Sequence, residues 1–355
     1  MSKLVALLNA NNIFYYQDAK NFLSQKPYCL DVKSDDYLYR FFYTSESDMT
    51  NEVVQECAGI ILEMSTNKVV CYGMNAFKES IETVVSCTEA IDGVQIKMFY
   101  YNDMWKYATR KSIDANKAFW GTEKSFQQLF LGAMDEVGFS TDIIEKLLNK
   151  NMTYTFVFQH PEFRNVSVVH EHQVYHISSR DMEILIEVPI TSGKGHLNVD
   201  LLLPQMDPYY TSVSDWQFQG LVFQDANFNR LKTVNLKWEH VKHIKGNYPD
   251  LEVRVLELIK NEDKHTLDIF EEYFNPVLVY NVRTKYNQLI TTILDKFKYY
   301  FIQQNMLDSS ERFYYVLMAM YVIYKKTKIR TNLQTCREVV QTLPLEVLSG
   351  FLGYN

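Results

Sequence analysis

The residues with the clearest potential for chemistry surround an Asp-Gly dipeptide at positions 92 and 93. A lysine amine at the end of a strand, helped by nearby positive charge and a metal, could attack a phosphate there as a nucleophile. The segment reads Glu89-Ala90-Ile91-Asp92-Gly93, so the position two residues before Asp92 carries only a methyl group. An Asp-Gly dipeptide alone is a weak signal, and its meaning depends on the neighbouring segments.

Six further segments follow one another in a fixed order on both sides of this dipeptide. Two lie upstream and four lie downstream, and several of them join a charged residue to a glycine or an aromatic residue. They are Glu56–Glu63, Lys68–Phe77, Trp105–Arg110 with Asp114-Ala115, Thr155–Phe158 with Pro161–Val166, Phe218–Phe223, and Arg230–Val234 with His243–Asn247. Chance is a poor explanation for six such segments in order.

In order and spacing these segments resemble the phage-type ATP-dependent RNA ligases, the RNA ligase 1 and tRNA-repair ligase group of the covalent nucleotidyltransferases. The resemblance covers about residues 50–250 by motif and extends more loosely to the C-terminal tail. It implies an α+β fold: an ATP-grasp-like ligase nucleotidyltransferase domain with antiparallel sheets, followed by an all-α domain. In this family the lysine of a KxDG tetrapeptide forms a lysyl-nucleotide with ATP.

The resemblance places Ala90 at the position of the nucleophilic lysine. Five other family positions lack their usual side chains. Ala58 stands in place of the arginine of an RG dipeptide, and Ala76 in place of the lysine of a KF dipeptide. Val157 and Gln219 stand in place of two glutamates, and Val234 in place of a lysine of the last segment. The candidates retained for nucleotide or phosphate contact are Asp92, Gly93, Arg164, Gly220, Arg230 and Lys232.

Each substitution has a physical consequence for the reaction. Without an amine at position 90 no covalent adduct can form. Three of the four cations that neutralise the triphosphate in this family are missing, which leaves a polyanion poorly balanced in the pocket. Valine cannot ligate a metal, and the glutamine at position 219 offers only a neutral carbonyl. We therefore expect no catalytic residues, no metal and no cofactor in a ligase-shaped pseudoenzyme.

Two alternatives keep the ligase reaction, RNA end joining through lysyl-AMP with ATP and Mg as cofactors. The alanines could be engineered, or the chemistry could have moved to another lysine. Lys97 is the specific candidate, but it lies seven residues from Ala90 in the following strand, which is an odd offset and about 23 Å when extended. A lysine that faces solvent or phosphate is the favoured interpretation of Lys97.

Other charged clusters give weaker indications of function. Among His160, His170, His172 and His176, the pair His170 and His172 could share a strand face and bind a metal, although such histidines are more often simply exposed. The basic runs Lys237, Lys242, His243, Lys245 and Lys325–Arg330 could contact RNA phosphates or could be solvated helix ends. No metal site is predicted from these clusters.

Composition bounds the remaining possibilities. The chain has 355 residues, 47% of them hydrophobic, which is enough for two cores. We predict two domains, at 1–249 and 250–355. The chain is strand-like from Val53 to Tyr248, with one helix over Lys124–Asn149, and helical afterwards. Pro276 and Asp308-Ser309-Ser310 mark predicted helix starts. The five cysteines form no CxxC pair, which favours reduced, mostly buried thiols.

Charge and composition also guide the prediction of partners. The formal net charge of −7 favours a protein partner in a larger assembly over RNA, although an acidic chain can still carry a local basic groove. The longest apolar run, Phe313–Tyr324, is shorter than a membrane span, and no signal peptide is visible. We expect a cytoplasmic protein without membrane contact, and a viral one by resemblance, present in the infected cell or the virion.

Overall fold

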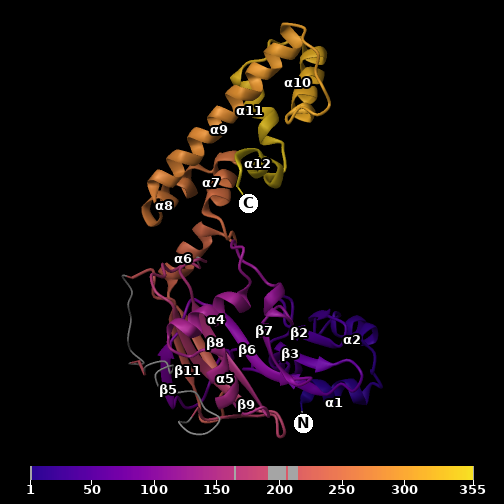
Figure 1. Cartoon of the computed structure of the whole chain (residues 1–355), viewed down its shortest axis with the longest axis vertical. Coiled ribbons are helices and arrows are strands. Elements are labelled where there is room, and N and C mark those ends of the chain that lie inside the picture. Colours follow the sequence, from indigo (N-terminus) through magenta and orange to yellow (C-terminus); the bar gives the residue numbers. More distant parts are fainter. Residues whose placement is uncertain (1, 164, 191–204, 207–214, 355) are drawn as a thin grey trace. The chain divides into compact units, whose positions relative to one another are not determined.

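The structure is a computed structural model that describes residues 2–163, 165–190, 205–206 and 215–354. The chain divides into two compact units, Met1–Glu239 and His240–Asn355. Figure 1 shows sheets and short helices in the first unit and helices in the second. The antiparallel sheets and the helical C-terminal region confirm the predicted α+β class.

Three antiparallel sheets form the frame of the N-terminal unit. The four-stranded sheet has the order β1 (Asp31–Ser34), β2 (Leu38–Phe42), β3 (Ala58–Glu63), β4 (Val69–Cys71). The five-stranded sheet has the order β10 (Ile186–Val188), β9 (Gln173–Asp181), β8 (Met152–Gln159), β6 (Val94–Tyr101), β7 (Met104–Thr109). The three-stranded sheet has the order β12 (Arg230–Val234), β11 (Gly220–Gln224), β5 (Ser86–Glu89).

Short helices accompany the sheets. They are α1 (Lys3–Ala10), α2 (Tyr16–Leu23), α3 (Glu52–Glu56), a 3-10 turn at Ala115–Lys117, α4 (Phe126–Glu136) and α5 (Thr141–Leu147). Asn51 and Ser125 cap α3 and α4 by accepting backbone N–H bonds, as such residues do at helix starts.

The five-stranded sheet has one apolar face and one partly polar face, because successive strand residues point to opposite sides. In β6, Ile96 and Met98 join the core that packs against α4, which lies over β8 and β6 in Figure 1. The alternate residues Lys97 and Phe99 turn toward the four-stranded sheet, and Phe99 packs there with Ile61 and other residues of both sheets. The candidate site lies on this second side.

The C-terminal unit continues as helices. They are α6 (Leu236–Lys245, which begins in the first unit), α7 (Leu251–Lys260), α8 (Lys264–Tyr273), α9 (Pro276–Phe297) with a π-helical turn at Lys298–Ile302, α10 (Tyr314–Thr327), α11 (Leu333–Gln341) and α12 (Leu345–Leu352). The spacing of Leu289, Ile290, Ile293, Leu294 and Phe297 places them all on the buried side of α9. None of the described helices has both the length and the apolar character needed to cross a membrane.

Several sequence predictions are confirmed and three are corrected. Pro276 is the first residue of α9, after the capping Asn275. The helix expected over Lys124–Asn149 is two helices, which end and restart around Gly138 at φ +87°. Asp308-Ser309-Ser310 forms a turn in which Asp308 accepts the Ser310 N–H at 2.7 Å, and α10 begins only at Tyr314. Within the region expected to be strand-like, Val53–Tyr248, residues 166–172 are not strand, and β9 begins at Gln173.

Candidate functional site

Ala90 lies where β5 meets β11. Its backbone N–H donates to the carbonyl of Gly220 at 2.9 Å, and the residue is only 2% exposed. The register of the two strands pairs the preceding residue, Glu89, with Leu221. The backbone at the position of the family lysine is therefore held by the sheet, and its side chain is a buried methyl group.

Gly220 is a glycine for a steric reason. Its φ is +140°, and a Cβ built there would lie 2.0 Å from the carbonyl oxygen of Thr233. The same residue pairs with Val234 of β12. Gly220 therefore brings Ala90, Gln219 and Val234 together, which are three of the positions where the resemblance expects charged side chains.

Asp92 and Gly93 hold the backbone of this site. The Asp92 carboxylate accepts the backbone N–H groups of Val166 and Ser167, both at 2.8 Å. A Cβ on Gly93 would lie 2.6 Å from the carbonyl of Phe158 and 3.3 Å from Val157. The retained Asp-Gly dipeptide thus fixes the segment that follows β8 to the segment that follows β5.

The remaining substituted positions are mostly buried. Val157 and Gln219 are each 8% exposed and Ala76 is 5% exposed, whereas Val234 is 39% exposed. Ala76 donates its N–H to Gln55, and Ala58 begins β3. The Gln219 side-chain oxygen has no hydrogen-bond partner among the described residues. A neutral amide oxygen by itself makes a poor metal site, because hard divalent cations prefer carboxylate ligands.

Arg230, predicted to contact phosphate, is engaged elsewhere. Its guanidinium forms a close ion pair with Glu187 of β10, and it donates to the carbonyl of Phe228 at 3.2 Å. Glu187 also lies 3.6 Å from Arg180 of β9, and the three side chains are at most 6% exposed. The structure therefore uses Arg230 in a buried Arg–Glu–Arg triad that ties the three-stranded sheet to the five-stranded sheet.

Lys232 and Arg164 are the two remaining retained candidates. Lys232 of β12 is half-buried, with its amine 6.0 Å from the centre of the Phe77 ring. Arg164 lies outside the described residues.

Lys97 does not face solvent, which was one of the two environments expected for it from the sequence. It is 1% exposed, and its amine donates to the carbonyl of Gly59. Burial lowers the pKa of this amine, Cys71 opposes that effect, and the positive charges of Arg40 and Arg110 lower the pKa further. Because β5 and β6 belong to different sheets, counting residues along one strand could not place Lys97 relative to Ala90.

The carboxylate beside Ala90 has an unusual environment. Burial, together with the negative charge of Asp215, raises the pKa of Glu89. The same carboxylate contributes to the raised pKa of Tyr175, after burial of that phenol. Glu89 and Asp215 therefore place two like charges within electrostatic reach of each other next to Ala90, and neither of them can balance a triphosphate.

The four histidines lie in different environments, and His170 is exposed, as the sequence favoured. His172 packs against His160, with ring centres 4.3 Å apart, while His170 is exposed. His176 is buried and bonds to Ser179 at 2.9 Å. Within the described ranges, no three His, Cys, Asp or Glu side chains are grouped to hold a metal ion.

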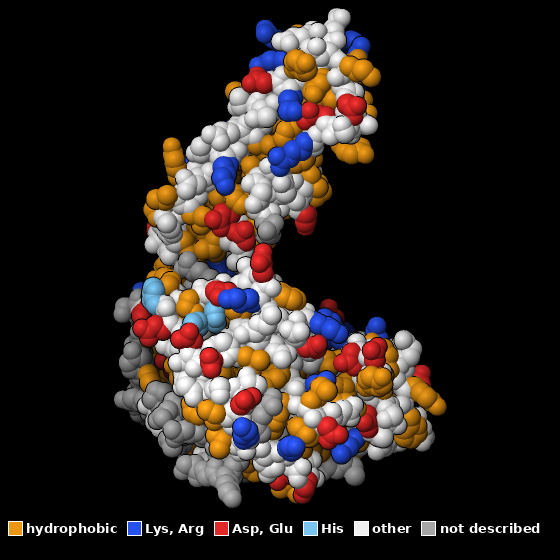
Figure 2. Space-filling view, in the orientation of Figure 1, with side chains coloured by type: hydrophobic (Ala, Val, Ile, Leu, Met, Phe, Trp, Pro, Cys, Tyr) orange, Lys and Arg blue, Asp and Glu red, His pale blue; other side chains and the backbone are white. Residues whose placement is uncertain are grey.

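The two basic runs differ in exposure. Lys245 is 3% exposed and donates to the carbonyl of Tyr248, so it is not part of a surface patch. Residues Lys325–Arg330 are all exposed, and Figure 2 shows Lys and Arg side chains at the end of the helical unit.

The sequence interpretation did not identify two buried charged residues of the N-terminal unit. Arg40 and Glu187 are charged yet 0% and 6% exposed. A signal existed for Arg40, because it interrupts the otherwise apolar strand Leu38–Phe42. Glu187 had no such signal, since a glutamate between two apolar residues also suits an exposed strand.

No protein-family model matches the chain. It is similar to the immediate-early protein ICP-46 homologs of Invertebrate iridescent virus 3, at 22% identity over 254 residues, and of Invertebrate iridescent virus 6, at 24% over 229 residues. The matches cover 65% and 58% of this chain and 56% and 49% of those proteins. The chain thus spans about half the length of the curated relatives it matches.

Two solved structures are also similar to the chain. One is an RNA ligase of Naegleria gruberi with ATP and Mn, at 13% identity and a TM-score of 0.30, covering 44% of this chain and 51% of that one. The other is a protein described as an ATP-dependent DNA ligase from Aquifex aeolicus, at 10% identity and a TM-score of 0.37, covering 94% and 87%.

Proposed function

We propose that this chain is a ligase-like protein without ligase chemistry, kept as a binding or structural subunit. The observation that carries the proposal is Ala90. Its methyl group stands where the motif order expects the nucleophilic lysine, and its backbone is fixed by the bond to Gly220. A methyl group cannot form a phosphoramidate with a nucleotide.

The neighbours of Ala90 support the same proposal. Val157 and Gln219 supply no carboxylate for a divalent metal, and Ala58, Ala76 and Val234 supply no cation for a triphosphate. Arg230 is neutralised by Glu187, so its charge does not replace theirs. Loss of one group could be an isolated substitution, but these losses affect nucleophile, metal and phosphate contacts together.

The test is incubation of the full chain with ATP labelled at the α-phosphate and with magnesium. We expect no labelled protein band after denaturing electrophoresis. A labelled band that survives SDS would refute the proposal, because it requires a covalent nucleotide on the chain. An authentic RNA ligase run alongside shows that the reagents form the adduct.

The second candidate function is an RNA ligase whose chemistry was mutated or moved. Lys97 favours it to a limited extent, because burial lowers the pKa of its amine and an unprotonated amine is nucleophilic. A label that disappears in Lys97→Arg but persists in the control Lys146→Arg would establish this alternative.

The variant Ala90→Lys distinguishes a decayed site from an engineered one. Five other positions would still lack their charges, so we expect no adduct in Ala90→Lys. Full labelling of this variant would mean that position 90 alone had been altered, and the pseudoenzyme proposal would fall.

We further propose that the partner is a protein and that the chain is a viral cytoplasmic protein produced early in infection. The net charge of −7 and the names of the two viral relatives, immediate-early protein homologs, support this. Crosslinking in infected cells, followed by affinity purification with and without RNase, tests it. We expect a protein partner that survives RNase; loss of all crosslinked material after RNase would assign RNA instead.

A further inference from the structure

Helix α10 of the C-terminal unit is apolar on all sides. The run Phe313–Tyr324 contains no charged residue. On one side of the helix Val316, Leu317 and Met320 are buried, and α10 packs against α9 and α11. A helix that is apolar all round is normally enclosed by protein, so the other side of α10 is expected to have a cover as well.

That other side is open to solvent. Tyr315 is 86% exposed, Val322 59% and Ile323 43%, and Ala319 is exposed too. Their spacing, i, i+4, i+7 and i+8, places the four residues in one stripe along the helix, about 12 Å long. We call Tyr315, Ala319, Val322 and Ile323 the α10 outer face. Single exposed apolar residues are ordinary, but a continuous stripe marks an interaction surface.

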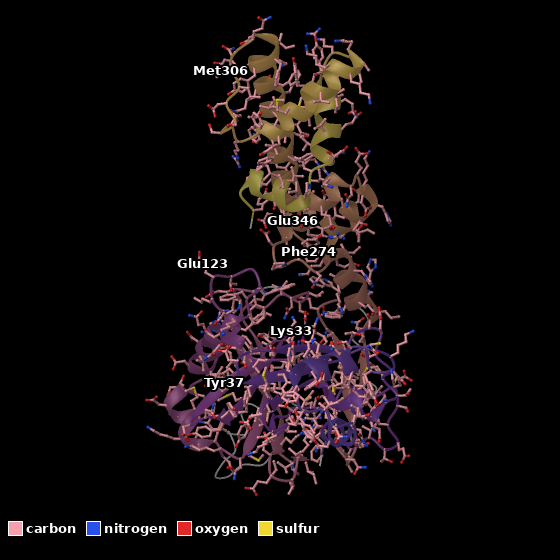
Figure 3. All side chains as sticks on the ribbon, turned by 90° about the vertical axis from the view of Figure 1, so that its right-hand side faces the viewer. Lys33, Tyr37, Glu123, Phe274, Met306 and Glu346 are labelled. Atoms are coloured by element: carbon pink, nitrogen blue, oxygen red, sulfur yellow. The ribbon has the colours of Figure 1, made fainter. Side chains whose placement is uncertain are left out.

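The chain that leads into α10 adds exposed apolar side chains. Ile302 of the π-helical turn is 57% exposed and Met306 is 91% exposed, and Figure 3 labels Met306 near the end of the helical unit. Phe301 stacks on Tyr321 of α10, with ring centres 4.3 Å apart, which holds the turn against the helix. The apolar surface at this end of the unit is therefore not confined to one helix.

Positive charge lies at one end of the α10 outer face. Lys325 and Lys326 belong to the last turn of α10, Lys328 and Arg330 follow it, and all four are exposed. Among the residues that the structure describes, no carboxylate forms an ion pair with these four cations. The surface therefore combines an apolar stripe with a cationic end that has no counter-charge.

We propose that the α10 outer face binds an amphipathic helix of a protein partner, with acidic residues in the first turn of that helix. The proposal rests on the proposed function, in which the partner is a protein, and adds the chemistry that the partner presents. An antiparallel helix places its first turn beside Lys325 and Lys326, where carboxylates meet the lysines and also suit the dipole of their own helix. Its apolar residues at i, i+3, i+4 and i+7 cover the stripe.

Three other occupants fit this surface less well. A second copy of the chain supplies no acidic turn, because α10 has no acidic residue in its first turn and Arg312 precedes it. Nucleic-acid bases stack on aromatic rings, whereas Val322 and Ile323 are β-branched. A helix that lies on a membrane carries cations along its polar face, whereas here they gather at one end.

The first experiment measures binding of labelled peptides to the full chain by fluorescence anisotropy. The acidic probe is an amphipathic peptide of about four helical turns, fixed as a helix by a lactam bridge, with glutamates in its first turn and leucines at i, i+3, i+4 and i+7. One control peptide carries lysines in place of the glutamates, and the other carries serines in place of the leucines. We expect saturable binding of the acidic probe alone. An acidic probe that binds no more tightly than either control overturns the proposal.

Matched variants then locate the binding. Val322→Gln with Ile323→Gln removes apolar contact and keeps good helix formers, and it should weaken binding of the acidic probe on the order of tenfold or more. Val277→Gln with Tyr280→Gln changes two apolar residues of α9 that are 57% and 67% exposed, and it should leave the affinity unchanged. Equal losses in both double variants would mean unspecific adsorption and would overturn the site.

The lysines give an independent check. Lys325→Gln with Lys326→Gln should weaken the acidic probe roughly threefold and reduce the salt dependence of its binding. Lys20→Gln with Lys264→Gln changes the net charge equally at exposed positions elsewhere and should have no effect. If both double variants lose affinity equally, the cationic end is not the contact and the proposal falls.

The other occupants are tested with the same variants. A single-stranded RNA oligonucleotide, vesicles of phosphatidylcholine and phosphatidylserine in equal parts, and self-association in sedimentation replace the peptide. Binding of any of these that Val322→Gln with Ile323→Gln abolishes would assign the face to that occupant and overturn the proposal. The adenylylation assay is separate: a covalent label would refute the pseudoenzyme proposal and leave peptide binding unaffected, and loss of peptide binding would leave the pseudoenzyme proposal standing.

Discussion

The buried Arg180–Glu187–Arg230 triad makes the sharpest stability prediction. The three side chains are at most 6% exposed, and Glu187 is the shared anion. Glu187→Gln leaves two arginines buried without a counter-charge. Breaking a buried ion pair by removing one partner costs about 3–5 kcal/mol, because the remaining charge has lost its solvation and its partner.

The magnitude translates into a thermal shift of the N-terminal unit. At about 2–4 °C per kcal/mol for a unit of this size, we expect Glu187→Gln to lower its Tm by about 6–20 °C. Tryptophan fluorescence isolates this unit, because Trp105, Trp120, Trp216 and Trp238 all lie within Met1–Glu239. The helical unit contributes no tryptophan signal to the same transition.

Two controls separate the buried triad from a general effect of charge. Glu162→Gln removes the exposed pair with Lys124, where the side chains are 43% and 55% exposed, and should change stability by less than about 1 kcal/mol. The triple variant Arg180→Met, Glu187→Leu, Arg230→Met removes all three charges and should recover much of the loss. The reasoning fails if Glu187→Gln is no more destabilising than Glu162→Gln.

Three further predictions follow from single contacts. Gly220→Ala should lower the free energy of unfolding by about 3 kcal/mol or more, because φ is +140° and the new Cβ would overlap the Thr233 carbonyl. The control Gly138→Ala also has a positive φ but no atom within 4 Å of the new Cβ, so it should cost about 1 kcal/mol. Denaturant titration measures both values. Asp92→Ala should speed amide exchange at Val166 and Ser167 relative to Asp92→Asn, which keeps an acceptor; equal exchange in both would contradict the assigned bonds. A hydrogen bond with Asp250 and, to a smaller extent, burial raise the pKa of Glu252 to about 7. The protonated carboxyl therefore stabilises the folded state, and this stabilisation is lost as pH rises from about 4.5 to 7. Calorimetry of Glu252→Gln should therefore show a flatter stability profile in that window, and an unchanged profile would refute the assignment.

Local sequence patterns predicted much of the framework. The strand-like character expected between Val53 and Tyr248 includes β6, and the helical character expected afterwards includes α9. Both depend on local side-chain types and periods, and both segments fold as expected. Residue identity alone also limits the chemistry at position 90, because no fold can give Ala90 an amine. The helix expected over Lys124–Asn149 was wrong in its continuity, because a single glycine with positive φ divides an otherwise consistent apolar pattern.

Only the tertiary structure decided what the charged residues do. Arg230 meets Glu187 across 43 residues of sequence, and Asp92 meets Ser167 across 75. Lys97 looked solvent-facing along its own strand, but pairing of the sheets buries it beside Gly59 and within the electrostatic reach of Arg40. A charged side chain can be solvated by water, form an ion pair or bind a ligand, and the free energy of each of these environments depends on burial. Burial is a property of how the sheets pack, so the sequence determined that position 90 carries no amine, and the fold decided where the charged residues lie.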